Sequence, residues 1–340
     1  MKKKKGFTLV ELLVVIAIIA LLMGILMPAL ARVRQIAYRM VSGTNQSGIG
    51  KAMMIYANDN DGDYPVSGSR NVSWVDNGFL PKWDEQDRKT AYEYDKATDA
   101  TDMTITSCFY LLVKYADVAT KQFLNRADVG TLEFSFAEDP PSSPDTLDLT
   151  DVWDFGGTEV LPGKYCSYSY HFPFYGDYVG RDKKYYPITQ QSNPSKPVIA
   201  DRNPYCIPSG EADSAPHSTP DTEIADPIWD DTDGFIDKDG KMNATAHQQN
   251  GQNVLFNDIH VRFEKLSNCG INNDNIYVPW SADKTGMGTG VAFRKKVNGF
   301  DASGWSSISG SSYDGDRGTS EMAPYDEDDS FLVSELLQDK

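Results

Sequence analysis

An apolar stretch close to the N-terminus constrains the fold of this chain more than any other feature. Lys2 to Lys5 precede the stretch, which runs from Phe7 to Ala31 and is interrupted only by Thr8, Glu11, Gly24 and Pro28. A helix of about 25 residues reaches ~37 Å, enough to cross a hydrocarbon core of ~30 Å with some tilt. Because the lysines stay in the cytoplasm, the sequence predicts a single-pass membrane protein whose N-terminus is cytoplasmic and whose remainder, after Ala31, lies on the far side.

This stretch can be interpreted as one of three kinds of targeting segment. A cleaved secretory signal would use the site Ala29-Leu30-Ala31, but the stretch is long for such a signal and contains a carboxylate. A plain signal anchor leaves Glu11 unexplained, because a lone carboxylate deep in lipid costs roughly 2.5–3.5 kcal/mol. The third kind accounts for both features. The run Lys5-Gly6-Phe7-Thr8-Leu9-Val10-Glu11 and the apolar residues after it resemble the signal of type IV prepilins and type II secretion pseudopilins.

This resemblance covers residues 2 to about 31 and implies a processing step and an assembly contact. A prepilin peptidase would cut between Gly6 and Phe7 and methylate the new amine of Phe7. Glu11 matches the carboxylate, five places into the mature chain, that in this family pairs with the N-terminal amine of a neighbouring subunit. An ammonium is the natural partner for a carboxylate in a low-dielectric helix bundle. Pro28 matches a helix-kinking proline that is common in the family.

The resemblance also implies a function. It is that of a structural subunit, a pseudopilin or pilin-like protein, in a type II secretion-like or type IV pilus-like assembly. Such a subunit is held in the bacterial inner membrane and is assembled into a periplasmic or surface filament. Its partners would be the prepilin peptidase, other pilin or pseudopilin subunits and an inner-membrane assembly platform. The alternative is a low-copy minor subunit whose head binds a secreted protein, a glycan or Ca²⁺.

The rest of the pattern divides the chain into segments. These are a leader of residues 1–6, a helix of residues 7–58 with its membrane-spanning part at about 7–31, and an extracytoplasmic head of residues 59–340. Residues 59–65 contain the Asp, Gly and Pro residues that end helices. Residues 42–50 are poor in helix formers, and the apolar stripes on either side of them are out of phase by about half a turn. The helix therefore either loosens there, which we favour, or is buried on more than one side.

The head is predicted to be α+β, with an antiparallel β-sheet and long acidic loops. Residues 109–113 predict a short helix, residues 165–170 alternate like a half-buried strand, and residues 197–201 are typical of a buried strand. Residues 253–264 predict a β-hairpin. Together with the N-terminal helix, these elements predict a pilin-like fold.

A second resemblance lies close to this hairpin. His247 and residues 251–261 resemble the "H-X9-DG" C-terminal module that accompanies prepilin signals in some bacteria, although ten residues separate His247 from Asp258 and Ile259 replaces the glycine. A β-branched residue disfavours positive φ. We therefore expect Asn257 and Asp258 to provide the left-handed positions of the turn.

Charge and cysteine content narrow the remaining possibilities. The net charge is −17 and the pI about 4.6, so the surface repels phosphate backbones and nucleic acid is not expected as a partner. No CxxC pair exists among Cys108, Cys166, Cys206 and Cys269, which argues against a zinc ribbon. Outside the cytoplasm they could form two disulfides in any of three pairings, and the alternative is free buried thiols.

Two acidic clusters have spacings that suit Ca²⁺, which prefers hard oxygen ligands. The denser cluster is Asp231, Asp233, Asp237 and Asp239, and the other is Asp59, Asp61 and Asp63. Neither matches the full EF-hand spacing, and no Glu arrives at the twelfth position. The denser cluster is the candidate calcium site, and the alternative is that both clusters are solvated acidic turns.

The sequence contains no recognisable catalytic arrangement. The four histidines form no HExxH motif, and no GxSxG, P-loop or GxGxxG motif occurs in a suitable context. We therefore expect that the protein is not an enzyme and that it has no cofactor unless Ca²⁺ binds the denser acidic cluster.

Overall fold

A computed structural model of the chain contains one long helix and a head built around a five-stranded sheet. It describes residues 9–68, 82–85, 87–92, 104–128, 131–137, 140–141, 147–156, 162–171, 173, 187–202, 243–277, 330 and 332–333. The helices are α1 (Leu9–Asn58), α2 (Arg88–Ala91), α3 (Ile105–Ala116), and the 3₁₀ turns η1 (Thr120–Phe123), η2 (Pro162–Tyr165), η4 (Thr245–His247) and η5 (Ile271–Asn273). The strands are β1 (Tyr168–His171), β2 (Pro197–Asp201), β3 (Gln252–Phe256), β4 (Val261–Glu264) and β5 (Leu332–Val333).

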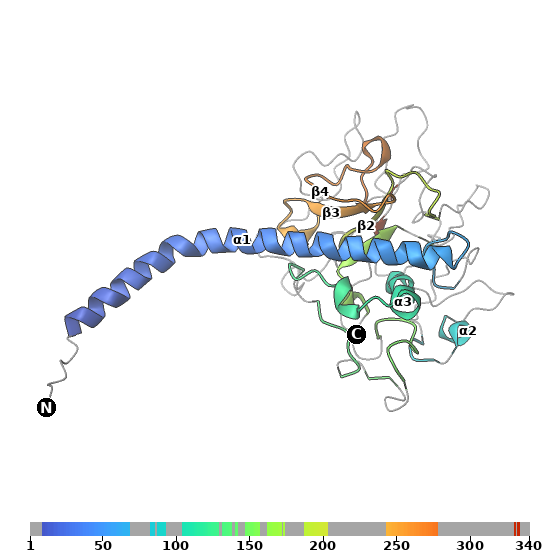
Figure 1. Cartoon of the computed structure of the whole chain (residues 1–340), viewed down its shortest axis with the longest axis horizontal. Coiled ribbons are helices and arrows are strands. Elements are labelled where there is room, and N and C mark those ends of the chain that lie inside the picture. Colours follow the sequence, from blue (N-terminus) through green and yellow to red (C-terminus); the bar gives the residue numbers. More distant parts are fainter. Residues whose placement is uncertain are drawn as a thin grey trace, which may run out of the picture.

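The first half of α1 projects from the head, and its second half lies across the head (Figure 1). The most apolar stretch of the helix has none of its residues buried inside the protein, and its length and composition are sufficient to cross a membrane. Pro28 lies within the projecting half, which is visibly curved. Because proline lacks an N–H and clashes with the preceding turn, bending of the helix there is expected.

The second half of α1 corrects one expectation. The helix is continuous through residues 42–50, so the predicted loosening is wrong. The alternative, burial on more than one side, is confirmed, because the helix contacts β3 on one side and α3 and η1 on another. The buried residues of this half span a wide arc that includes adjacent pairs: Ser42, Gln46, Ile49, Gly50, Ala52, Met53, Tyr56 and Ala57. Val33 and Met40, on the earlier stripe, are 61% and 67% exposed. The phase change therefore marks the point where the helix leaves the head, and packing maintains the helix despite its weak helix formers.

The sheet has the strand order β4-β3-β2-β1-β5, and every neighbouring pair is antiparallel. The predicted strands in residues 165–170 and 197–201 and the predicted hairpin correspond to β1, β2 and the β3–β4 pair. α1 crosses the sheet in contact with β3, β4 and β2 (Figure 1). The α+β fold class, with a long N-terminal helix followed by an antiparallel sheet, is thus confirmed.

The turn of the hairpin differs from the expectation. Asn257 and Asp258 do occupy its centre, but the left-handed residue is Ile259, with φ 69°. A left-handed β-branched residue costs roughly 1–2 kcal/mol. The Ile259 side chain packs against the core, where its Cδ1 atom would lie 3.3 Å from a Cβ built on Gly50 of α1. Packing against the helix therefore offsets the backbone strain.

The cysteines in the described part of the chain are free thiols. Cys108 and Cys166 are buried and Cys269 is partly buried, and none of the three forms a disulfide. Any pairing into two disulfides would join two of these three, so that alternative is wrong. Burial raises the pKa of the Cys108 and Cys166 thiols to about 12, which makes both unreactive at neutral pH.

Asp154 should make the stability of the head depend on pH. It is fully buried near the start of α3, and burial raises its pKa to about 7 although Thr104 Oγ1 donates to its Oδ2 at 2.5 Å. The folded state therefore binds a proton that the unfolded state, in which the aspartate has its ordinary pKa of 3.8, has released. The free energy of unfolding should fall as pH rises from about 4 to 7, by at most about 1.4 kcal/mol per pH unit from this group. Asp154→Asn should flatten that slope in denaturant titrations at pH 5, 6 and 7, and an unchanged slope would contradict the assignment.

Candidate functional site

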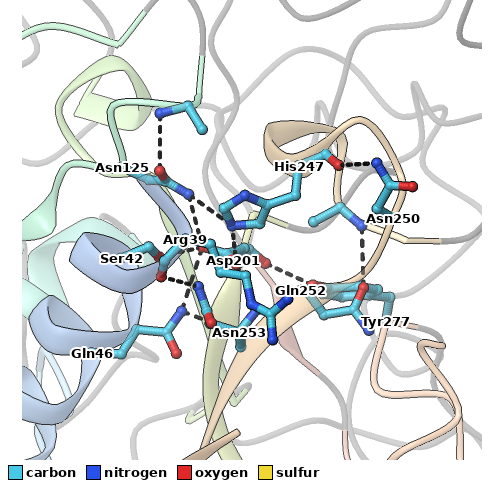
Figure 2. A network of polar contacts seen from close by, with 12 residues as sticks. Arg39, Ser42, Gln46, Asn125, Asp201, His247, Asn250, Gln252, Asn253 and Tyr277 are labelled. Atoms are coloured by element: carbon cyan, nitrogen blue, oxygen red, sulfur yellow. Dashed lines mark hydrogen bonds and ion pairs between the residues drawn. The ribbon is translucent and has the colours of Figure 1, made fainter. Parts of the chain in front are cut away.

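Asp201, the last residue of β2, is the centre of a buried polar network that joins the helix to the sheet (Figure 2). Its side chain is fully buried. Its carboxylate accepts hydrogen bonds from Ser42 Oγ at 2.7 Å, Gln46 Nε2 at 3.5 Å, Asn125 Nδ2 at 3.0 Å and the backbone N–H of Asn253 at 2.7 Å, and His247 Nε2 lies 3.0 Å away. These groups replace the water that a buried carboxylate loses, which is the condition for burying it.

Local geometry brings these groups to one place. The antiparallel register pairs Ala200 with Val254, so Asn253 on β3 lies next to Asp201 on β2. Ser42 and Gln46 lie one turn apart on the face of α1 that crosses the sheet. The chain enters β3 through Gly251, whose φ is 136° and where an added Cβ would lie 2.2 Å from Glu264 O. Only glycine fits there, and this turn places His247 over the end of the sheet.

The environment of His247 favours its charged form. Burial alone lowers the pKa of this imidazole, but the negative charge of Asp201 and the hydrogen bond to it outweigh burial and raise the pKa above its ordinary value. The side chain of His247 is 6% exposed and that of Asp201 is fully buried. A hydrogen-bonded pair of buried side chains therefore lies at the centre of the network, and removing one partner of such a pair is strongly destabilising.

The arrangement suits docking better than nucleophilic catalysis. In a Ser-His-Asp catalytic site the histidine lies between the nucleophile and the carboxylate. Here Ser42 Oγ donates directly to Asp201 Oδ1, and His247 faces the other carboxylate oxygen. The serine hydroxyl is thus held as a hydrogen-bond donor to the carboxylate, and no base lies next to it within the network.

Further polar contacts fix the helix in one register on the head. Asn253 Nδ2 donates to Arg39 O at 3.1 Å, and Gln46 Nε2 donates to Asn253 O at 3.3 Å. Asn45 Nδ2 donates to Leu124 O at 3.0 Å, and Gln122 Nε2 donates back to Asn45 O at 3.3 Å. Apolar packing alone tolerates sliding by a turn, whereas buried hydrogen bonds are lost in any other register.

A buried ion pair lies beside the network. Arg202 Nε donates to Asp128 Oδ2 at 3.0 Å, and the two side chains are 1% and 0% exposed. Arg202 Nη2 also donates to Gly163 O at 2.8 Å and to Cys166 O. The guanidinium therefore ties β2 to η2 and to the segment after η1, which stabilises the surroundings of Asp201.

A cavity of about 550 Å³ opens next to His247. Cationic side chains that line it are Arg34, Arg39, Arg126 and Lys265. The Arg39 guanidinium carbon lies 3.4 Å from the centre of the Phe263 ring, and burial lowers the pKa of Arg39. His247, a member of the polar network, thus forms part of the wall of a cationic pocket.

The residues predicted from the sequence fall in different places. Glu11 is exposed on the projecting half of α1. Gly6 and Phe7, and also Asp231, Asp233, Asp237 and Asp239, lie outside the described residues, so cleavage and calcium binding stay predictions. Among the described residues, no group of three His, Cys, Asp or Glu side chains could hold a metal ion.

The histidine and the aspartate of the motif near the hairpin, His247 and Asp258, do not contact each other but have separate partners. His247 contacts Asp201, whereas Asp258 of the same motif contacts His260 Nδ1 in the turn. The sequence placed Asp201 at the end of a buried strand but gave neither it nor Arg202 a role. Ser42 and Gln46 fall on the same helical face as Ile49 and Met53, and that periodicity could have identified them as buried.

The comparisons with known proteins agree with the N-terminal pattern. Residues 1–27 match the family described as "Prokaryotic N-terminal methylation motif". No curated protein and no solved structure matches the chain. The motif implies processing by a prepilin peptidase and assembly with other pilin subunits, and the long apolar helix α1 is consistent with a single-pass inner-membrane anchor. The chain therefore carries a prepilin-type methylation motif, which indicates a prepilin substrate similar to type IV pilins and pseudopilins.

Proposed function

We propose that the protein is a structural subunit, a pseudopilin or pilin-like protein, of a type II secretion-like or type IV pilus-like assembly. The observation that carries the proposal is the projecting half of α1, which contains most of the methylation motif and leaves its apolar side chains uncovered by the head. Among the side chains so exposed are Leu9, Leu21, Ile25 and Leu30, each more than half exposed. Exposed apolar surface of this extent requires lipid or other helices as its surroundings.

The proposed pathway begins in the inner membrane and ends in a filament. A prepilin peptidase cleaves between Gly6 and Phe7 and methylates the amine of Phe7. Glu11 of the mature subunit then pairs with the N-terminal amine of a neighbour on the assembly platform, because a carboxylate in a helix bundle needs a cation. The head is carried outside the cytoplasm by the register-fixed second half of α1.

Processing provides the direct test. Mass spectrometry of the native protein should find a mature N-terminus at a methylated Phe7. Gly6→Val should abolish cleavage, because the peptidase site admits only a small residue before the cut.

Gly24→Val is the matched control for this test. It is the same substitution in the same apolar stretch, and a Cβ at Gly24 meets nothing within 4 Å. This variant should be processed normally. A native chain that keeps Met1, or one that begins after Ala31, would contradict the proposal.

A further inference from the structure

The cationic pocket beside His247 has a charge opposite to that of the protein as a whole. The chain carries a net charge of −17, yet four cationic side chains line this cavity: Arg34 and Arg39 from α1, Arg126 after η1, and Lys265 after β4. Of the described residues that line the cavity, Asp128 is the one with a carboxylate, and its Oδ2 accepts from the buried Arg202. Among the described residues, none of the four cations forms an ion pair with a carboxylate. The pocket thus has positive charge available for a ligand.

The pocket lies at the level where the helix would emerge from a bilayer. The apolar stretch ends at Ala31, and Arg34 and Arg39 follow it by about 4.5 and 12 Å along the helix. The headgroup layer on each side of a ~30 Å hydrocarbon core is roughly 5–8 Å thick. Figure 1 shows β4 on α1 near the place where the helix leaves the head, and Lys265 directly follows β4. Arg34 therefore lies within the headgroup layer, and Arg39 lies just beyond it, where its long side chain can extend back towards the lipid phosphates.

The walls of the pocket suit an amphiphilic ligand. Ile36, Ala246 and Phe263 contribute apolar surface between the cations. A volume of about 550 Å³ is in the range of small-molecule pockets and large enough for a headgroup with its glycerol. Guanidinium groups match the geometry of a phosphate with two parallel hydrogen bonds. Arg34 and Arg39, exposed on the helix, can reach such a group from the membrane side.

We infer that this pocket binds the phosphate headgroup of an anionic phospholipid from the leaflet that surrounds α1. Bound lipid would orient the head on the membrane before assembly. The inference rests on the membrane anchoring in the proposed function, but not on cleavage or filament formation.

The test uses the full chain reconstituted in nanodiscs or detergent micelles. Native mass spectrometry with added phosphatidylglycerol or phosphatidylcholine should show that the anionic phosphatidylglycerol binds at least about tenfold more tightly than phosphatidylcholine. The double variant Arg126→Gln with Lys265→Gln should reduce phosphatidylglycerol binding by about 10- to 30-fold. Lys51→Gln with Lys121→Gln removes the same charge from exposed positions outside the pocket and should leave binding unchanged. If the double variant Arg126→Gln with Lys265→Gln fails to fold, the single variant Arg34→Gln, on the exposed part of α1, should still lower anionic-lipid binding by about fivefold.

Each alternative outcome is distinguishable. Equal binding of the two lipids, or equal losses in the pocket pair and the control pair, would overturn the inference. Inorganic phosphate that binds as tightly as the lipid would assign the site to a free anion instead. Loss of self-association in the pocket variant, with lipid binding intact, would assign it to an acidic surface of a second copy. Carbonate extraction of the wild-type chain from membranes tests the anchor separately, so a failure of anchoring is not confused with a failure of lipid binding.

Discussion

Replacing Asp201 with alanine should lower the free energy of unfolding by about 3–5 kcal/mol. The substitution leaves Ser42 Oγ and the Asn253 N–H, both buried, without their acceptor. It also removes the carboxylate that raises the pKa of His247. Denaturant titration of the full chain in detergent, followed by tryptophan fluorescence, measures the loss.

Two further variants distinguish the stability lost by breaking the network from the stability lost by removing any carboxylate. Asp59→Ala removes an exposed carboxylate just after α1 and should change stability by no more than about 0.5 kcal/mol. Ser42→Ala combined with Asp201→Ala should cost clearly less than the sum of the two single variants, because both remove one contact between helix and strand. Strict additivity, or a loss in Asp201→Ala no greater than in Asp59→Ala, would show that the network does not fix the helix to the head.

Replacing Glu11 with valine should leave processing intact and reduce incorporation into filaments by about tenfold or more, the factor that 1.4 kcal/mol per contact gives. The cleavage site between Gly6 and Phe7 is unchanged, and a more apolar helix inserts at least as well. The loss should appear in assembly alone, because the proposed partner of Glu11 is the N-terminal amine of the next subunit. Immunoblots of sheared filaments and of total mature protein give the incorporated fraction.

Thr8→Val is the control for Glu11→Val, since it removes a polar group from the same stretch without removing charge. It should assemble nearly as well as the wild type. Normal incorporation of Glu11→Val in an otherwise wild-type cell would refute the assembly role of Glu11.

Local patterns were enough to predict the framework of the fold. The apolar run, the helix-ending residues after Asn58 and the alternation around the hairpin all depend on neighbours in the chain, and the structure has α1, β3 and β4 there. The same kind of local reasoning failed at residues 42–50, where weak helix propensity is overridden by packing against the sheet. It failed again at Ile259, whose left-handed backbone is offset by contact with a helix about two hundred residues earlier in the chain.

The candidate site could not be predicted from local patterns either, because it depends on contacts between residues that are far apart in the sequence. Its members come from α1, the segment after η1, β2, η4 and β3: Ser42, Asn125, Asp201, His247 and Asn253. No short motif links them, and a single sequence holds no signal of which buried polar residues will meet. The periodicity of α1 could show that Ser42 is buried, but the partner that makes this burial favourable is set by the fold alone.

The way α1 completes the head determines where the chain can be truncated to obtain a water-soluble form. Ile49, Met53 and Tyr56 fill the core, so a chain that begins after Asn58 would leave a trough along the sheet and a carboxylate at Asp201 short of two donors. A start between Ala31 and Arg39 removes the apolar stretch and keeps the carbonyl of Arg39 that Asn253 requires. The shortest water-soluble version of this protein should therefore still carry about the last 20 of the 50 residues of α1.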